Sequence, residues 1–292
     1  MQSYFKIFYK WGYLLMNLQF GLIGHPVFHS ISPFIHSRLF ELSKISADYR
    51  LFDISPNDLA DSLPLLNSLC GYNITIPHKQ RIIPFLDALC DKADLYKCVN
   101  TVKNDGSSVG FNTDASGFLS ALSFEKITLN GNVTILGCGG VARIFCFESV
   151  LRGCNVTLAA RNQSIGHAER LAADVKTATG KTIHVTSIDK LPQNIDILIN
   201  ATPVGMFPNI SQMPIADADL KNCKAVFNAV YNPIETLLIK KSRKNGAKVA
   251  SGMSMLIFQA VFAHKIWTGA KFSDADIFQL ILDSKENLKK FG

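Results

Sequence analysis

The sequence predicts an α/β protein of two domains, each built around a mostly parallel sheet. Short apolar runs alternate with stretches of helical apolar spacing through nearly all of the 292 residues. A polar joint around residues 123–131 interrupts this alternation, and a strand-like run restarts directly after it. The chain is long enough for two ordinary domains, so we place a domain boundary at this joint.

The chain divides into four predicted parts: an N-terminal extension (1–18), a first domain (19–122), a second domain (123–251) and two C-terminal helices (252–292). The helices are expected to pack back on the first domain. The extension is rich in aromatic residues and carries Lys6 and Lys10. It has neither the long apolar stretch nor the small-residue cleavage site of a signal peptide. Two interpretations stay open for it, a short amphipathic surface anchor and an addition upstream of a working start at Met16.

In the first domain, strands are expected at residues 19–24, 49–54 and 71–76, and helices at 33–42 and 59–66. Ser32 is positioned as the N-cap of the first helix, with Pro33 at the first helical position. A hairpin is expected from strands at 99–103 and 108–111, because the Asn104-Asp105-Gly106 turn lies between them. In the second domain, strands are expected at 132–136, 155–159, 183–186, 195–200 and 225–228, and helices at 141–151 and 163–178. The C-terminal helices break near residues 268–269.

Composition narrows the classes of partner. The 30 basic and 23 acidic residues give a formal charge of +7, which favours anionic partners. No basic block or nucleic-acid-binding motif accompanies that charge, so a nucleic-acid-binding module has only the net charge in its favour. No run of about twenty apolar residues predicts a membrane span. The seven scattered cysteines form no C-x-x-C pair and indicate reduced thiols in a cytoplasmic protein. The histidines lack metal-site spacing, so no metal is expected.

A glycine turn in the second domain predicts a nucleotide site. The turn follows a strand and opens a helix, and it comprises Gly137, Cys138, Gly139, Gly140 and Val141. Glycines there let backbone N–H groups approach a pyrophosphate at the helix N-terminus. This strand–turn–helix–strand context predicts a Rossmann-type dinucleotide-binding domain.

The end of the next strand indicates which dinucleotide is bound. Ala160, Arg161 and Asn162 stand where an acidic residue would grip the ribose of NAD. An arginine without an acidic neighbour suits the 2′-phosphate of NADP instead. NAD stays open because no second basic residue follows promptly, and Arg161 could also be an ordinary solvated charge.

Polar residues in the first domain predict a substrate site. Ser30 and Ser32 are two residues apart, so both hydroxyls can face one way and cradle a carboxylate, although Ser32 could simply cap the helix. Asn73 and Thr75 share one face of a strand, and Lys79 lies beyond its carboxyl end, where ligands of α/β sheets collect.

Lys79 and Asp114 make the pair that a hydride-transfer enzyme needs. When a carbonyl carbon receives hydride, its oxygen becomes an alkoxide and requires a proton. A lysine ammonium can stabilise and protonate that oxygen, and a carboxylate can orient the ammonium. The sequence therefore predicts a dehydrogenase acting on a small hydroxylated carboxylate. Taken alone, the lysine could be a solvated charge and Asp114 a helix cap.

Several motifs follow one another in order over about residues 19–288. They are GHPVFHSISPFIHS, NITIPHK, VNTV, GFNTDASGF, GCGGVA, NATPVGM, VYNPIETLL and SGMSMLIFQA with a later WTG. In this order they resemble the shikimate dehydrogenase family. The resemblance implies NADPH-dependent reduction of 3-dehydroshikimate to shikimate, a step in aromatic amino-acid biosynthesis.

The same resemblance implies a role for each matched residue. Lys79 is the implied acid/base and pairs with Asp114, while Ser30 and Ser32 bind the carboxylate. The remaining implied substrate contacts are Thr75, Asn100, Asp114, Tyr231 and Gln259. The implied cofactor contacts are Gly137 to Val141, Arg161, Thr202, Ala229 and Gly252. The apolar row Met253, Leu256, Phe258 and Ile266 is read as core packing.

The chain departs from the family pattern at four places. Ala160 stands where asparagine is usual, which removes one polar contact to the adenosine end of the cofactor. Asn228 replaces a common aspartate, Leu237 a common proline and Ala115 a common glycine. None of these changes removes a proposed catalytic group.

Two rival functions stay open. The first is a quinate or dual quinate/shikimate dehydrogenase, because quinate differs at the carbon that carries the carboxylate. The second is a non-catalytic nucleotide-sensing protein on the same scaffold, which the presence of both Lys79 and Asp114 disfavours. The chain is expected to act on a small molecule as a monomer or homodimer.

Overall fold

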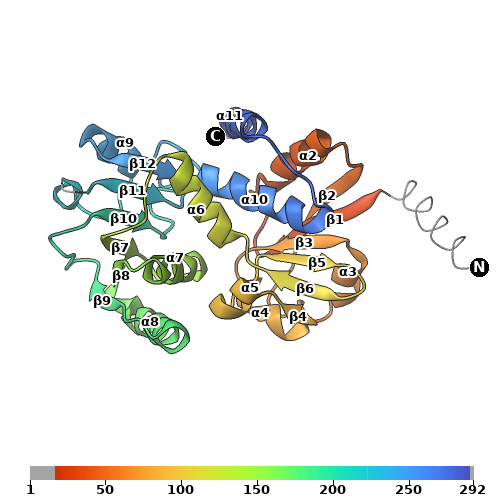
Figure 1. The fold of residues 1–292 in the computed structure, drawn as a ribbon, viewed down its shortest axis with the longest axis horizontal. Helices are drawn as coiled ribbons and strands as arrows, with labels where there is room; N and C mark the ends of the chain where they lie inside the picture. Colours follow the sequence, from red (N-terminus) through yellow and green to blue (C-terminus); the bar gives the residue numbers. More distant parts are fainter. Residues whose placement is uncertain (1–16, 222, 290–292) are drawn as a thin grey trace, which may run out of the picture.

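The computed structural model describes residues 17–221 and 223–289, which form two lobes with one six-stranded sheet each. Figure 1 shows the lobes at opposite ends of the long axis, with helices α6 (Asp114–Phe124) and α10 (Gly252–Thr268) running together between them. The predictions for residues 1–16, an anchor or a start at Met16, lie outside the described residues. Strand β1 begins at Leu18, so that residue is not part of an extension.

The first lobe contains a mixed sheet in the order β2-β1-β3-β5-β6-β4. β1 pairs in parallel with β2 and β3, whereas β5 is antiparallel to β3 and β6. The predicted hairpin is therefore confirmed, and Gly106 takes a φ of +78° in its turn. The strands are β1 (Leu18–Gly24), β2 (Ala47–Asp53), β3 (Gly71–Ile74), β4 (Ala88–Leu89), β5 (Thr101–Asn104) and β6 (Ser108–Phe111).

The second lobe contains a wholly parallel sheet in the order β12-β11-β10-β7-β8-β9. Read from the other edge, the order is the 3-2-1-4-5-6 arrangement of a dinucleotide-binding fold. The Rossmann-type prediction is confirmed. The strands are β7 (Asn132–Leu136), β8 (Asn155–Ala160), β9 (His184–Ser187), β10 (Ile197–Asn200), β11 (Ala225–Asn228) and β12 (Lys248–Ser251).

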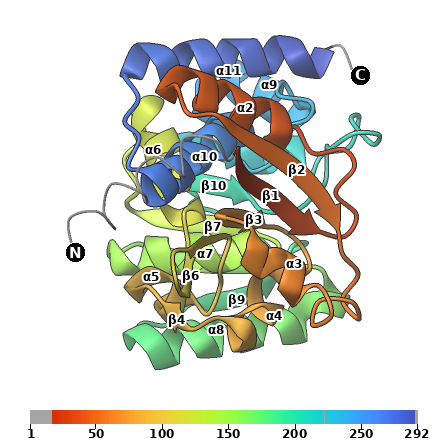
Figure 2. The ribbon, with the colours of Figure 1, turned by 90° about the vertical axis from the view of Figure 1, so that its right-hand side faces the viewer.

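Helices cover both sheets, and the two C-terminal helices return to the first lobe. Figure 2 shows α11 (Asp274–Lys289) lying along α2 (Ser32–Ser43), and α10 contacts α2, α6 and β5. The other helices are α3 (Leu63–Ser68), α4 (His78–Arg81), α5 (Asp91–Tyr96), α7 (Gly140–Leu151), α8 (Ile165–Thr179) and α9 (Leu237–Lys244). Short 3-10 turns are η1 (Ile83–Phe85), η2 (Asn162–Ser164) and η3 (Asp217–Leu220).

Some local predictions were wrong. Ser32 is the first residue of α2 rather than its N-cap, so Pro33 is the second helical residue, and no side chain caps that helix. Instead, the Ser32 backbone N–H donates to Ser30 Oγ at 3.2 Å, so the Ser30 hydroxyl accepts from the first N–H group of the helix. The predicted helix at 59–66 starts only at Leu63. The predictions also omitted the helices α4, α5, α6 and α9 and the strands β4 and β12. β12 lies at the edge of the second sheet, and only one of its four residues, Ala250, is buried, so its local sequence lacks the apolar run of the other strands.

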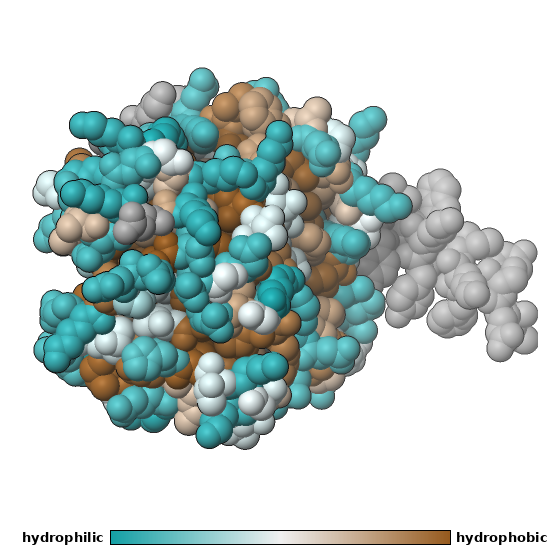
Figure 3. All heavy atoms as spheres, turned by 60° about the vertical axis from the view of Figure 1, so that its left-hand side comes forward, coloured by the Kyte–Doolittle hydropathy of each residue, from teal (hydrophilic) through white to brown (hydrophobic). Residues whose placement is uncertain are grey.

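Separate apolar clusters stabilise the lobes and the C-terminal helices. The largest lies between β7, β8, α6 and α7 and includes Phe118, Phe145 and Phe227 in mutual ring contact. Burial of such aromatic side chains dominates the energetics of a core. In Figure 3, hydrophilic side chains cover most of the visible face, and hydrophobic residues show mainly in recesses between them. Among the described residues, no helix combines the length and apolar character needed to span a bilayer.

Candidate active site

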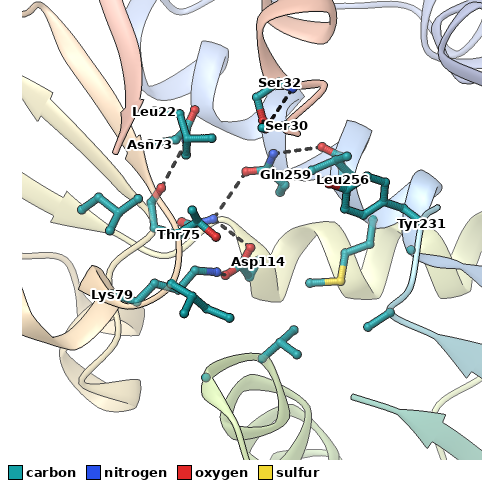
Figure 4. A pocket seen from close by; sticks show the side chains of 18 of the residues that line it. Leu22, Ser30, Ser32, Asn73, Thr75, Lys79, Asp114, Tyr231, Leu256 and Gln259 are labelled. Carbon is teal, nitrogen blue, oxygen red and sulfur yellow. Dashed lines mark hydrogen bonds and ion pairs between the residues drawn. The ribbon is translucent and has the colours of Figure 1, made fainter. Parts of the chain in front are cut away.

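A cleft of about 400 Å³ lies between the lobes and is lined by residues of both. From the first lobe it receives the loop after β1 and the end of β3, and from the second lobe the glycine turn. Figure 4 shows the labelled side chains converging on this space from several elements. All nine residues predicted for catalysis and substrate binding line it: Ser30, Ser32, Asn73, Thr75, Lys79, Asn100, Asp114, Tyr231 and Gln259.

Lys79 and Asp114 form an ion pair in the floor of the cleft. Lys79 Nζ donates to Asp114 Oδ2 at 2.6 Å, and the two side chains are 18% and 9% exposed. Lys79 lies in α4, one turn after β3, and Asp114 is the first residue of α6. Asp114 is thus not a helix cap, and its carboxylate lies at the N-terminus of α6, where the helix dipole stabilises negative charge.

The environment keeps Lys79 in its ammonium form. Burial by itself lowers the pKa of Lys79, but the adjacent Asp114 carboxylate and its hydrogen bond raise the pKa more, and the net direction is upward. The free site therefore holds a proton on Lys79 at neutral pH. That is the state a proton donor needs when a carbonyl oxygen is being reduced.

A buried amide fixes Asp114 from its other side. Asn100 Nδ2 donates to Asp114 Oδ1 at 2.9 Å and approaches Gln259 Oε1 at 3.4 Å. Asn100 Oδ1 accepts from the Thr113 backbone N–H at 2.7 Å, just before α6 begins. Since both oxygens of Asp114 are engaged, the carboxylate has one orientation. The residues facing the cleft are therefore held before any substrate arrives.

Asn73 is held more tightly than its predicted role requires. Its Oδ1 accepts from the Tyr49 hydroxyl at 2.8 Å, and its Nδ2 donates to Thr101 Oγ1 at 3.0 Å and to the Asn100 carbonyl at 3.2 Å. Both amide hydrogens are thus used inside the protein. Asn73 links β2, β3 and β5 under the cleft, and its side chain supports Asn100.

Ser30 and Ser32 face each other at the opposite end of the cleft. Ser30 Oγ donates to Ser32 Oγ at 3.0 Å, and Figure 4 shows the pair separated from Lys79 by Gln259. Two adjacent hydroxyls can both turn toward a carboxylate, since hydroxyl hydrogens rotate freely. The arrangement could hold a carboxylate at one end of a ligand while Lys79 and Asp114 contact the other.

The glycine turn leaves room for a dinucleotide. A methyl group added at Gly139 or Gly140 would meet nothing within 4 Å, so open space lies above the start of α7. Gly137 has a φ of +93°, and a methyl there would lie 2.8 Å from Thr202 Cγ2. A methyl at Gly252 would lie 2.1 Å from the Ala229 carbonyl oxygen. Glycine is therefore required at two of these positions and leaves space at the other two, which fits a pyrophosphate at this helix N-terminus.

Only part of the predicted cofactor set lines the cleft itself. Gly139, Gly140, Val141, Ala229 and Gly252 do, whereas Gly137, Cys138, Ala160, Arg161, Asn162 and Thr202 lie outside its lining. Arg161 and Asn162 are exposed after β8. Ala160 is 2% exposed, so its side chain is unavailable to a ligand. Thr202 Oγ1 donates to Asn200 Oδ1 at 2.6 Å and holds the turn after β10.

A second cation, Arg170, was missed from the sequence. Burial raises the pKa of the Cys138 thiol, and the positive charges of Arg161 and Arg170 lower it by a smaller amount. Arg170 Nη1 would lie 3.8 Å from a methyl on Gly166, so this guanidinium folds back toward the start of α8. Cys138 Sγ contacts the Ser164 carbonyl at 3.7 Å, which ties the glycine turn to the same region. Arg170 is exposed and lies nine positions after Arg161, so the local sequence offered no reason to group the two cations.

The structure corrects the interpretation of Leu256 and accounts for the departure from the family pattern at Asn228. Met255 and Leu256 line the cleft, so Leu256 is not solely a core residue. Asn228 is fully buried, accepts from Asn200 Nδ2 at 2.9 Å and donates to Thr236 Oγ1 at 2.8 Å. An amide can donate and accept at once, which explains its place where the family pattern has aspartate. Within the described residues, no cluster of three or more His, Cys, Asp or Glu suits a metal.

Sequence comparison shows which known proteins this chain resembles. Residues 22–102 match a family model described as the shikimate dehydrogenase substrate binding domain. A shikimate dehydrogenase (NADP(+)) of Caldanaerobacter subterraneus is 37% identical over 268 residues, which cover 90% of this chain and 95% of that protein. One from Methanocaldococcus jannaschii is 39% identical over 260 residues, covering 86% of this chain and 91% of the relative.

Solved structures extend the similarity to three dimensions. A shikimate dehydrogenase in complex with NADP+ has a TM-score of 0.85 and 36% identity, covering 92% of this chain and 96% of its own. The Thermus thermophilus shikimate 5-dehydrogenase in complex with NADP(H) and shikimate has a TM-score of 0.82 and 30% identity, covering 91% and 99%. A 5-ketofructose reductase of Gluconobacter also shares the fold, with a TM-score of 0.81 at 28% identity and coverage of 92% and 99%.

Proposed function

Because the chain belongs to the shikimate dehydrogenase family, we propose that it catalyses the reversible NADPH-dependent reduction of 3-dehydroshikimate to shikimate. The observation that carries this proposal is the 2.6 Å Lys79–Asp114 pair in a cleft whose other wall is the glycine turn. A cleft with a substrate side, a nucleotide side and an ammonium group between them has the groups needed for carbonyl reduction.

The residues act by holding the substrate and moving one proton. Ser30 and Ser32 bind the carboxylate, while Thr75, Asn100, Gln259 and Tyr231 contact the ring and its hydroxyls. Bound NADPH supplies the hydride to the carbonyl carbon. Lys79 donates its proton to the carbonyl oxygen as negative charge develops there, and Asp114 orients the ammonium and binds a neighbouring hydroxyl. In the reverse direction, neutral Lys79 accepts the hydroxyl proton.

Residues of the second lobe would hold the cofactor. The backbone N–H groups of residues 137–141 would bind the pyrophosphate, and Arg161 would bind the 2′-phosphate, with Arg170 as a second cation of the same lobe. Within residues 17–221 and 223–289, neither arginine forms an ion pair with a carboxylate, which suits binding of a dianionic phosphate. Gly252 brings the start of α10 close against Ala229, in the segment after β11, and the two residues would line the nicotinamide end of the site.

An absorbance assay of NADP+ reduction with shikimate tests the function, repeated with quinate and with NAD+. We expect turnover with shikimate and NADP+ to exceed the other combinations. Equal or better turnover of quinate would reassign the substrate to the quinate rival. Binding of NADP+ without turnover of either acid would favour the nucleotide-sensing protein.

We propose a cytoplasmic location and a monomer or homodimer. All seven cysteines are free, and Cys98, Cys146, Cys154 and Cys223 are buried, which suits a reducing compartment. Cell fractionation tests the location, and light scattering on the purified protein gives the oligomeric state.

A further inference from the structure

Tyr96 lies at the junction of the lobes in a buried polar cluster that the proposed chemistry does not use. It ends α5 of the first lobe and is fully buried. Its hydroxyl donates to the carboxylate of Glu148 in α7 of the second lobe, and its ring meets Phe147 edge-on at 5.3 Å. Burial raises the pKa of Tyr96, as does its hydrogen bond to Glu148, so the hydroxyl stays a proton-bearing donor.

The Glu148 carboxylate is almost completely buried. Its side chain is 2% exposed and is matched by Lys92 Nζ at 3.4 Å and by the Arg152 guanidinium. Lys92 comes from α5, and Arg152 follows α7. A buried carboxylate is costly unless it is paired, so the site needs these partners from both lobes.

Arg143 holds the same tyrosine through its backbone. Its Nε donates to the Tyr96 carbonyl, one of the oxygens left without a helical partner at the end of α5. Its Nη1 donates to Asp174 Oδ2 of α8 at 2.6 Å. The two ends of Tyr96 are therefore both attached to α7, by residues five positions apart.

The chain connects this cluster to both walls of the cleft. α7 begins at Gly140 in the glycine turn, less than one turn before Arg143. On the other side, Val99 N–H donates to the Lys79 carbonyl at 2.8 Å, and Asn100 holds Asp114. Tyr96 thus precedes by three and four positions the two residues, Val99 and Asn100, that contact Lys79 and Asp114.

We propose that Tyr96, Arg143 and Glu148 form an interlobe clasp that sets the position of the glycine turn relative to Lys79 and Asp114. These are positioning residues, because none of them lines the cleft. The clasp aligns the hydride donor with the substrate carbonyl after both have bound. The inference rests on the proposed reaction, since alignment matters only if hydride crosses the cleft.

The test is Tyr96→Phe, which removes only the hydroxyl that reaches Glu148. We expect kcat to fall about tenfold while the KM values for substrate and NADPH change less than about twofold, because misplaced reactants still bind but react more slowly. The deuterium isotope effect on kcat, measured with NADPH deuterated at the transferred position, should rise as hydride transfer becomes rate-limiting. Tyr72→Phe, a buried tyrosine of β3, is the matched control and should leave both values unchanged.

A second pair of variants keeps the test decisive if Tyr96→Phe is unstable. Glu148→Gln retains an oxygen that can accept from Tyr96, whereas Glu148→Leu does not, so kcat should fall further in the leucine variant. A lower melting temperature with wild-type kcat and isotope effect would overturn the clasp and leave a purely structural cluster. An inactive wild type would instead reject the proposed reaction, which separates the two failures.

Discussion

The two walls of the cleft present different chemical groups to a ligand, backbone groups on one side and side chains on the other. The nucleotide wall consists mainly of backbone at a glycine turn, with exposed cations beyond it. The substrate wall consists of side chains held in a buried network from Tyr49 through Asn73 and Asn100 to Asp114. One wall offers space and N–H groups, and the other offers oriented polar groups.

This difference separates affinity from chemistry. Backbone N–H groups bind a phosphate largely independently of the side chains around them. Substitutions around the glycine turn should therefore change mainly the KM for the cofactor. A preorganised side-chain network acts on the transition state, so substitutions there should change mainly kcat.

The largest effect is expected at Lys79. Lys79→Ala should lower kcat by about two orders of magnitude or more with much less change in KM, because the variant loses the proton donor but keeps the binding groups. Steady-state kinetics in the reducing direction measure this. An unchanged kcat would move the chemistry to another residue.

Asp114→Asn should change the pH profile as well as the rate. Asp114 raises the pKa of Lys79 above its usual 10.5. Shikimate oxidation needs neutral Lys79, so its rate should rise with pH across the neutral and alkaline range. Without the carboxylate, burial lowers the Lys79 pKa, and the plateau should move to lower pH. Identical profiles for the two proteins would exclude Lys79 as the titrating group.

The nucleotide wall should respond at Arg161 and Arg170. Each change to Gln should raise the KM for NADPH about tenfold and leave NADH unaffected, since a charge-assisted contact to the 2′-phosphate is lost. Titration with adenosine 2′,5′-bisphosphate against 5′-AMP gives the same comparison without turnover. Lys176→Gln, an exposed lysine later in α8, is the charge-matched control. Equal losses with NADPH and NADH would assign both arginines to general attraction.

The smallest effect concerns two histidines behind the substrate wall. His36 Nδ1 lies 3.0 Å from His264 Nε2, and His36 stacks on Tyr49 at 4.0 Å. Burial lowers the pKa of His264 to about 3, from 6.5. The unfolded chain therefore takes up this proton first as pH falls, and the free energy of unfolding decreases from about pH 6.5 toward 3.

His264→Gln cannot titrate, so its loss of stability between pH 6.5 and 4 should be smaller by about 1–3 kcal/mol. Denaturant unfolding at several pH values measures this. His167→Gln, at an exposed position in α8, is the control. A parallel decline in wild type and variant would contradict the buried neutral histidine.

Sequence reasoning succeeded where the signal is local. The glycine turn between β7 and α7, the strand alternation and the hairpin at Gly106 are written into neighbouring residues. Sequence reasoning did not identify polar partners that are distant along the chain. Asn73 lines the cleft as a predicted substrate contact, but the sequence did not indicate that Tyr49 and Thr101 would hold its amide. Arg170 received no prediction, because no neighbouring residue sets this exposed cation of α8 apart from other surface charges.

The sequence by itself determined the two-sheet α/β plan and the residue types around the cleft, because period, turn chemistry and motif spacing act over a few residues. Only the tertiary structure decided which polar atoms meet. Asn100 and Asp114 lie 14 positions apart, and Tyr96 and Glu148 52 apart. Such pairs form because buried polar groups must find partners once the sheets and helices have packed.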